Sequence, residues 1–514
     1  MKELTTYLHR LLDQGDYETA RKLVLETLDQ ETKTNTATTI RQIELYGFLI
    51  DIGCETSNES DLEKGVVFLT EKEDEIKQLI TISSYCYNLA NAKHGLCKIF
   101  YSNNRGVHSI SLCREKFQEP IDLYWSAYKS SDKKDFFYNH QILINLSNSL
   151  MTNCRIVEAL QMLDTVLRDN PQFPQALISR GDDLHYLSLV TNCSVSIALF
   201  AQIYSSYKKG IDTKTLPPHI LNKTQFGMEE AMQKIISYGF SMGDLETEIE
   251  ESQKEYEQHS DYRKFCNDNF LTLNEHSLYC NCIATSRDEL QIGIPNVVFN
   301  GKLLPKLELL LNRIKSEFAF ARWNYYKSFT DEAFDYDVTF SELFEDEVIN
   351  SQSEALRASF RICYGILDKI ALGICKLYGT EGGNIYFERF WEDKNRKEVL
   401  DNQKNIHLNA LSSIANDLNS KRGELKHFKN WRNKIEHNLL ILQEKTKLNI
   451  DVFNILDDKE FVVAVDIEDF REKTIHLLQL TRAAVLSFVY CVRLETITTK
   501  EVEATNALTI SMKQ

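Results

Sequence analysis

The chain has 514 residues, enough for about three domains, or for one domain joined to an array of repeats. Hydrophobic residues make up 43% and charged residues 26%, a composition that forms a buried core and excludes a disordered chain. With only 7 Pro and 19 Gly for tight turns, a β-sandwich or a hairpin-rich barrel is disfavoured. The net charge of −16 disfavours general nucleic-acid binding, so any such role must come from a local basic patch.

The N-terminus and the cysteines predict a cytoplasmic protein with no membrane contact. Residues 1–7 lack the apolar stretch of a signal peptide. No segment approaches the ~18 uncharged apolar residues of a membrane span. The 12 cysteines are scattered, mostly within apolar helical patterns, as free thiols are in a reducing compartment.

One Cys/His cluster stands apart, namely Cys280 and Cys282 with His276 upstream. A single residue separates the thiols, which is shorter than the spacing of a zinc knuckle, and no second pair follows. A loop or helix end with core thiols is therefore favoured over a metal site. Phosphate-binding glycine motifs are also absent, so the sequence predicts neither a metal nor a cofactor.

The first 243 residues predict a degenerate tetratricopeptide-like helical solenoid. Two apolar stripes in residues 141–167, separated by a polar turn at Asn153 and closed by Pro171, predict an antiparallel helix pair. Looser copies begin near Leu4, with Gly15 in the turn, and near Pro174. The alternative is an irregular helical domain without a true repeat. Either arrangement leaves a surface suited to a protein or peptide partner. The stripes consist of Leu143, Leu146, Leu150, Ala159, Leu163 and Val166.

Residues 244–330 are predicted to form a helical connector. The acidic segment 245–258 is typical of a solvated helix and marks the boundary. A long helix over residues 303–329 follows, and its aromatic stripe favours core packing over base stacking.

Residues 331–495 predict a helical bundle, and residues 496–514 a C-terminal tail. Apolar residues from Leu356 to Leu377 recur at spacings of 4 and 3, the seam of a bundle helix. Further helices are predicted over residues 406–418, 421–442 and 470–491. Two short β-branched segments, 449–456 and 461–467, predict a β-hairpin inserted in the bundle. The fold class is therefore mainly α.

The third bundle helix carries Arg432, Asn433 and His437. An Arg followed five positions later by a His occurs four times in the chain, but Asn follows the Arg only at Arg432. Asn433 and His437 share a helix face, and the long Arg432 side chain can reach it. The alternative is an Arg432–Glu436 ion pair beside an ordinary boundary histidine. Core anchoring is predicted for Ile435, Leu439 and Leu442.

The Arg-Asn-x-x-x-His motif on a late bundle helix resembles that of the HEPN superfamily (higher eukaryotes and prokaryotes nucleotide-binding). The span from Tyr262 to about Leu494 is similar to a bacterial branch of that superfamily carried behind tetratricopeptide-like helices. Supporting strings are Tyr262-Arg263-Lys264-Phe265-Cys266 and Phe360-Arg361-x-x-Tyr364-x-x-x-Asp368-Lys369-Ile370-Ala371. The resemblance implies a metal-independent endoribonuclease of the toxin or anti-phage type that acts as a homodimer.

The three motif residues suit RNA cleavage by attack of a 2′-hydroxyl on the adjacent phosphate. His437 titrates near neutral pH and fits general acid/base catalysis. Arg432 offers a permanently charged fork for the phosphate, and Asn433 can orient either group. One His cannot easily act as acid and base in one step, so two motifs brought together in a symmetric dimer are expected.

The charge around the motif agrees with an RNA substrate. Six basic residues against one acid between positions 421 and 434 give +5 within a chain of −16. The alternative is a solvated helix face. Besides the motif, the candidate RNA-binding residues are Lys421, Arg422, Lys426, Lys429 and Lys434.

Two functions follow from these residues. The first is a ribonuclease effector regulated by its tetratricopeptide-like half. The second is a non-catalytic interaction scaffold whose bundle serves as a dimerisation or nucleotide-binding module.

Overall fold

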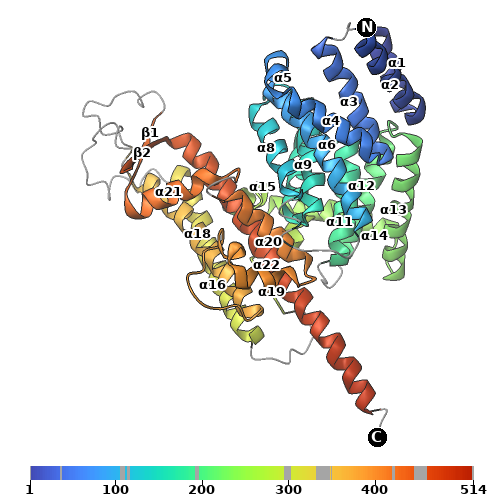
Figure 1. The fold of residues 1–514 in the computed structure, drawn as a ribbon. Helices are drawn as coiled ribbons and strands as arrows, with labels where there is room; N and C mark the ends of the chain where they lie inside the picture. Colours follow the sequence, from blue (N-terminus) through green and yellow to red (C-terminus); the bar gives the residue numbers. More distant parts are fainter. Residues whose placement is uncertain are drawn as a thin grey trace. The chain divides into compact units, whose positions relative to one another are not determined.

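The computed structural model describes residues 2–34, 38–104, 110, 112, 116–190, 196–293, 303–330, 348, 350–419, 423–444 and 460–511. The described chain is almost entirely helical, as predicted, and its two strands form one small sheet (Figure 1). The chain divides into two compact units. The first comprises residues 1–186 and 200–239, and the second residues 187–199 and 240–514.

The first unit consists of helices packed on one another through apolar faces. Their bounds are α1 (Lys2–Asp13), α2 (Tyr17–Thr34), α3 (Thr39–Thr56), α4 (Glu59–Glu71), α5 (Glu73–Leu79), α6 (Ile82–Asn103), α8 (Gln118–Ser130), α9 (Phe136–Thr152), α10 (Ile156–Asp169), α11 (Pro174–Val190), α12 (Ile197–Asp212) and α13 (Pro218–Ser237).

The predicted helix pair over residues 141–167 is confirmed as α9 and α10, joined by a turn at Asn153. All six of its predicted apolar positions are buried in one core cluster. Gly15 adopts a φ of +75° in the turn between α1 and α2, where a side chain would be strained. Gly181 faces the ring of Tyr207, which a Cβ atom would approach to 2.5 Å. The packed helices establish that the first unit is helical, and the tetratricopeptide-like repeat stays a prediction.

The second unit contains the predicted bundle. Its bounds are α14 (Met242–Glu257), α15 (Asp261–Asp268), the short 3-10 helices η1 (Glu275–Leu278), η2 (Ile283–Ser286) and η3 (Phe390–Glu392), α16 (Leu303–Thr330), α18 (Ser351–Leu377), α19 (Lys394–Asp401), α20 (Ile406–Asp417), α21 (Lys426–His437), β1 (Leu439–Gln443), β2 (Val462–Asp466) and α22 (Ile467–Ser511).

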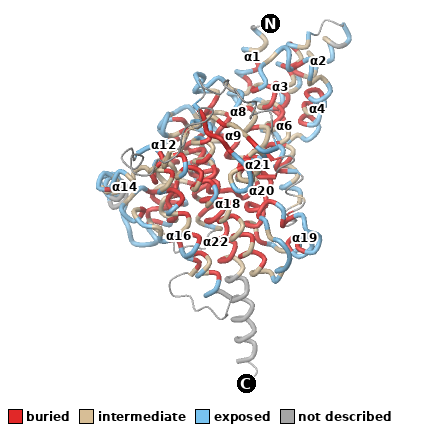
Figure 2. Tube along the Cα trace, turned by 90° about the vertical axis from the view of Figure 1, so that its left-hand side faces the viewer, coloured by how far each residue is buried: buried red, intermediate tan, exposed pale blue. Residues whose placement is uncertain are grey.

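Helix α18 packs along α16 and α22, and α20 also packs on α22 (Figure 1). The seam predicted from Leu356 to Leu377 is buried at every position up to Ile374 and half-buried at Leu377, which confirms the periodicity. Buried residues follow α18, α20 and α22 in Figure 2. On α16 the aromatic residues divide: Phe318 and Tyr325 are buried, whereas Phe320 and Trp323 are exposed.

Two sequence predictions about the end of the bundle are wrong. The helix predicted to continue to residue 442 ends at His437 as α21, and strand β1 follows from Leu439. Strand β2 occupies the second predicted segment, but it pairs with β1 in parallel, from Leu439 opposite Val462 to Gln443 opposite Asp466. A hairpin would be antiparallel. The other predicted hairpin segment, 449–456, lies outside the described residues.

Among the described residues, one helical segment, Ile467–Glu495, is long and apolar enough to cross a membrane. Its most apolar window is 83% buried inside the protein, as in the core helix of a bundle.

Candidate functional site around Arg432

Helix α21 is fixed to the bundle by aromatic rings. Trp431 packs on Phe428 of the same helix and on Phe360 of α18 and Phe470 of α22, with ring centroids 5.3–6.1 Å apart. All four rings are buried. The buried positions of α21 are Phe428, Trp431 and Lys434. Of the predicted anchors, Leu442 is buried but lies in β1, Ile435 is half-buried and Leu439 is exposed. Trp431 directly precedes Arg432 and Phe428 lies one helical turn before it, so the packed rings hold the motif on a rigid helix.

The beginning of α21 depends on a tight turn at Gly423. The amide of Leu425 donates to the carbonyl of Asp417, at the end of α20, over 2.8 Å. A Cβ at Gly423 would lie 2.2 Å from that same carbonyl oxygen and 2.4 Å from that of Asn416. Only glycine therefore allows the chain to turn from α20 into α21 at this distance.

The end of α21 is held by the backbone carbonyl of Glu460, just before β2. Both the Lys434 ammonium and the Asn438 amide donate hydrogen bonds to this oxygen. The amide of Leu439 then donates to the carbonyl of Phe461 over 3.0 Å, which begins the pairing of the strands. His437, one residue before this junction, is exposed.

The structure places Arg432 and Asn433 in direct contact. Nη1 of Arg432 donates to Oδ1 of Asn433 over 3.2 Å, and both side chains are half-buried. Among the described residues, Arg432 makes no ion pair with Glu436, which was the alternative interpretation of the motif. His437 lies one helical turn beyond Asn433 on the same face, as expected from their spacing.

Arg432 acts electrostatically on Asp368 and Tyr364, and Glu388 lies near the same two residues; sequence reasoning missed this arrangement. Asp368 and Tyr364 come from α18, one turn apart, and Glu388 precedes η3. Asp368 Oδ1 accepts a hydrogen bond of 2.9 Å from the amide of Phe387, next to Glu388. Tyr364 and Asp368 both lie in a string that supported the family resemblance, but nothing in the sequence relates them to Arg432.

The charges of this group act on one another. Burial raises the pKa of Asp368 to about 6, and the nearby Glu388 adds to the effect, while Arg432 opposes it. Burial also raises the pKa of Tyr364 well above its ordinary value, with the same two carboxylates adding and Arg432 again opposing. Arg432 thus opposes the rise of both pKa values, while Lys429 forms the ion pair with Glu388.

The predicted RNA-binding residues have different surroundings. Lys421 and Arg422 lie outside the described residues. Lys426 is exposed at the first turn of α21. Lys429 forms an ion pair with the buried Glu388, and Lys434 is only 7% exposed. The structure thus leaves Lys426 in solvent and places Lys429 and Lys434 against protein acceptors.

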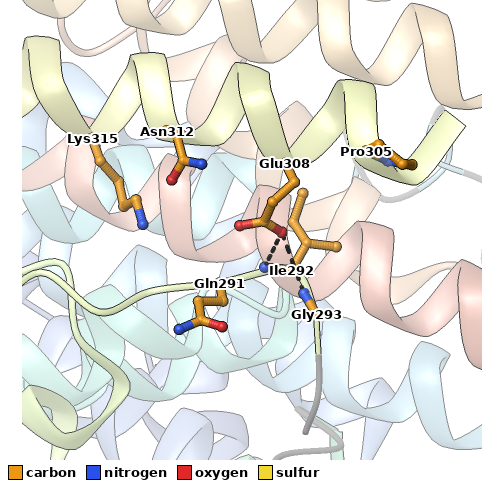
Figure 3. A pocket seen from close by; sticks show the side chains of 7 residues that line it. All are labelled: Gln291, Ile292, Gly293, Pro305, Glu308, Asn312 and Lys315. Atoms are coloured by element: carbon orange, nitrogen blue, oxygen red, sulfur yellow. Dashed lines mark hydrogen bonds between the residues drawn. The ribbon is translucent and has the colours of Figure 1, made fainter. Parts of the chain in front are cut away.

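A separate cavity of about 510 Å³ lies between α16 and residues 291–293 (Figure 3). Glu308 accepts hydrogen bonds from the amides of Ile292 and Gly293, at 3.0 and 3.3 Å. Lys315 donates to the carbonyl of Leu290 over 2.8 Å. These side chains fasten the chain segment to α16, and none of the motif residues lines the cavity.

Comparison with known proteins places the site within a family. Residues 299–495 match the family model described as LA2681-like HEPN. The match begins just before α16 and includes α18 to β2 and most of α22, so the Arg432 motif and its acidic neighbours lie inside it. No curated protein and no solved structure matched the chain. Residues 299–495 of this chain therefore form a HEPN domain of the LA2681-like type.

Proposed function

We propose that the protein is a metal-independent endoribonuclease of the effector type. The observation that carries the proposal is the motif geometry: Arg432 is bonded to Asn433 on a rigidly packed helix, with His437 exposed one turn further. An exposed imidazole beside a preoriented guanidinium is what in-line cleavage of RNA requires.

In this reaction the 2′-hydroxyl attacks the adjacent phosphorus and the 5′-oxygen of the next nucleotide leaves. His437 transfers a proton at one of these oxygens. Arg432 binds the phosphate, whose negative charge increases as the fifth bond forms. Asn433 holds the guanidinium in place through the 3.2 Å hydrogen bond. The products carry a 2′,3′-cyclic phosphate and a 5′-hydroxyl.

The acidic neighbours set the position of Arg432 before RNA binds. Because the partly buried Asp368 interacts electrostatically with Arg432, the guanidinium is attracted to the protein rather than to solvent. A fixed cation loses less rotamer entropy when it binds phosphate. Two copies of the motif in a homodimer would supply separate acid and base groups.

The first unit would regulate this activity by binding a protein or peptide. A ribonuclease that acted continuously would damage its own cell, and a helical unit fused to it offers a means of restraint. The cytoplasm, where RNA is available, is the expected location.

A second function is favoured by the lysines. Because Lys429 and Lys434 contact Glu388 and Glu460, the bundle presents fewer cations to RNA than the sequence suggests. This favours a non-catalytic scaffold, with the HEPN domain as a dimerisation or nucleotide-binding module.

Cleavage of total RNA in EDTA by the purified full-length protein distinguishes the two functions. We expect cleavage by the wild type and its loss in His437→Ala and Arg432→Ala. Glu436→Gln is the matched control, because Glu436 is exposed on the same turn and outside the motif. Cleavage that persists in both motif variants contradicts the site. A wild type that neither cleaves RNA nor arrests growth on expression supports the scaffold.

A further inference from the structure

The loop between α15 and α16 brings three metal-binding side chains together. His276 lies in η1, Cys280 follows that helix, and Cys282 immediately precedes η2. The amide of Cys280 donates to the carbonyl of His276 over 2.8 Å, which places the two residues one turn apart. Cys282, two residues further, also lies close to His276, with its Sγ 4.0 Å from Nδ1.

The ligand atoms have nearly the separations that a zinc ion requires. One nitrogen or sulfur from each of the three side chains lies within 4.8 Å of the others. Cys282 Sγ is 4.0 Å from His276 Nδ1. Tetrahedral zinc with ordinary bond lengths sets about 3.6 Å between a sulfur and a nitrogen ligand, and about 3.8 Å between two sulfurs. Side-chain movements of up to about 1 Å would complete the geometry.

The surroundings of Cys280 favour a thiolate. The amide of Cys282 donates to Cys280 Sγ over 3.3 Å, and the Cys280 thiol in turn donates to the hydroxyl of Ser252 on α14 over 3.5 Å. A backbone N–H aimed at sulfur stabilises the charged form that binds metals. Cys280 is buried, whereas His276 and Cys282 are half-buried, so an ion can enter from solvent.

The loop is rigid because three buried polar residues hold its backbone and flanks. Asn274 donates to the carbonyls of Ala284 and Arg287, at 2.8 and 3.1 Å, which closes the loop. Arg482 of α22 donates to the carbonyl of Thr272 over 2.9 Å. Arg493 of α22 forms two hydrogen bonds with Glu275, beside His276. The three ligands are therefore positioned by the protein itself, without a metal.

A fourth ligand is available on α14. Glu255 Oε2 accepts a hydrogen bond of 2.9 Å from the amide of Ile283, the residue after Cys282. Its carboxylate thus lies at the edge of the cluster, on the side of α14. A thiolate-rich set with one imidazole selects Zn²⁺ over Mg²⁺ or Ca²⁺, which prefer oxygen ligands.

We propose that His276, Cys280 and Cys282 bind one Zn²⁺ ion, with Glu255 or a water molecule in the fourth position. The ion joins the loop to α14 and adds to the contacts that hold it on the bundle. The spacing of the two cysteines alone favours core thiols, because zinc knuckles have longer spacings. The fold compensates for the short spacing, because η1 places the His276 imidazole beside the two thiols.

The test is Co²⁺ and Zn²⁺ binding by the full-length protein, purified under reducing conditions and freed of metal. We expect one Co²⁺ per chain, with the absorption of tetrahedral cobalt and of thiolate-to-cobalt charge transfer, and displacement by Zn²⁺. Cys282→Ser and His276→Asn should each weaken binding at least 100-fold. Cys54→Ser, which changes a half-buried thiol in α3, should leave binding unchanged. Loss of binding in Glu255→Gln identifies the fourth ligand, and retained binding indicates water.

A second readout uses the wild type alone and does not depend on folding of the variants. Bound Zn²⁺ should protect Cys280 and Cys282, but not Cys54, from alkylation when the modified peptides are mapped by mass spectrometry. Substoichiometric Co²⁺ binding by the reduced wild type, or a cobalt spectrum unchanged in Cys282→Ser, would overturn the proposal. The cluster lies outside residues 299–495 and neither readout involves RNA, so this test is independent of the proposed activity.

Discussion

Arg432 donates a hydrogen bond to the side chain of Asn433, its neighbour in the chain, at 3.2 Å. Adjacent helix residues normally point in directions about 100° apart, so this contact requires the Arg432 side chain to bend toward the Asn433 face. Asp368 also attracts the guanidinium electrostatically. The Arg432 guanidinium is thus oriented by the Asn433 amide and by the charge of Asp368.

Substitution of Asn433 should show that it positions Arg432. We expect Asn433→Ala to lower RNA cleavage by roughly tenfold to a hundredfold, less than Arg432→Ala, because the cation stays but loses its orientation. The double variant should be no less active than Arg432→Ala alone, since the two residues act as one unit. Equal additive losses, measured as kcat/KM on a fixed RNA, would contradict this coupling.

Gly423→Ala should destabilise the protein by about 1–3 kcal/mol, because the added methyl overlaps the carbonyl oxygens of Asp417 and Asn416. Urea unfolding measures this change. Gly365→Ala on α18 is the matched control, because its Cβ would meet only the end of the Lys369 side chain, 3.8 Å away. There the free energy of unfolding should stay constant or rise by up to about 1 kcal/mol. Similar losses in both variants would be the contrary result.

Asp288→Asn should destabilise the protein by about 3–5 kcal/mol at pH 7, since it leaves Arg322 buried without its partner. Burial raises the pKa of Asp288, but the charge and hydrogen bonds of Arg322 outweigh it and hold the pKa below its usual value. The stabilisation is therefore present above about pH 4 and is lost as the pH falls further. Denaturant unfolding should show a smaller difference in unfolding free energy between the wild type and Asp288→Asn below pH 4 than at pH 7. A difference that stays constant with pH would exclude the ion pair as its cause.

Asp368→Asn should have the opposite pH dependence. Because burial raises the pKa of Asp368 to about 6 in the folded protein, the unfolded chain loses its proton first as the pH rises. The wild type thus loses stability between about pH 4 and pH 6. The amide keeps an oxygen for the Phe387 amide without the charge, so the variant should be more stable at pH 8 by about 1–3 kcal/mol. Near pH 4 the two proteins should be alike. A destabilised variant at pH 8 would show that Arg432 needs this charge.

The sequence predicted the bundle because periodicity reports a buried helix face directly. From Leu356 to Ile374, apolar residues at spacings of 4 and 3 indicate one buried helix face, and these residues are buried as expected. The end of α21 was mispredicted because residues 439–442 are all apolar. A short run of that kind suits a helix or a strand equally well. Pairing with β2, more than 20 residues later, decides between them.

The motif itself was found from Arg432, Asn433 and His437, but its surroundings depend on tertiary contacts. Glu388 forms an ion pair with Lys429, some 40 residues later in the chain, and acts together with Arg432 on the pKa of Asp368. Lys434 was expected on a solvated basic face, yet it is buried against the Glu460 carbonyl. Charge counted along a helix does not distinguish cations that face water from those that face protein.

The junction between α21 and β1 is made mainly of main-chain contacts. The amide of Leu439 pairs with Phe461, and the strands continue in register from there. The side chains of Glu436, His437 and Leu439 are exposed and lie on this fixed backbone. Selection can therefore exchange them with little cost in folding. The chemistry of this short surface can therefore change while the backbone that carries it keeps its fold.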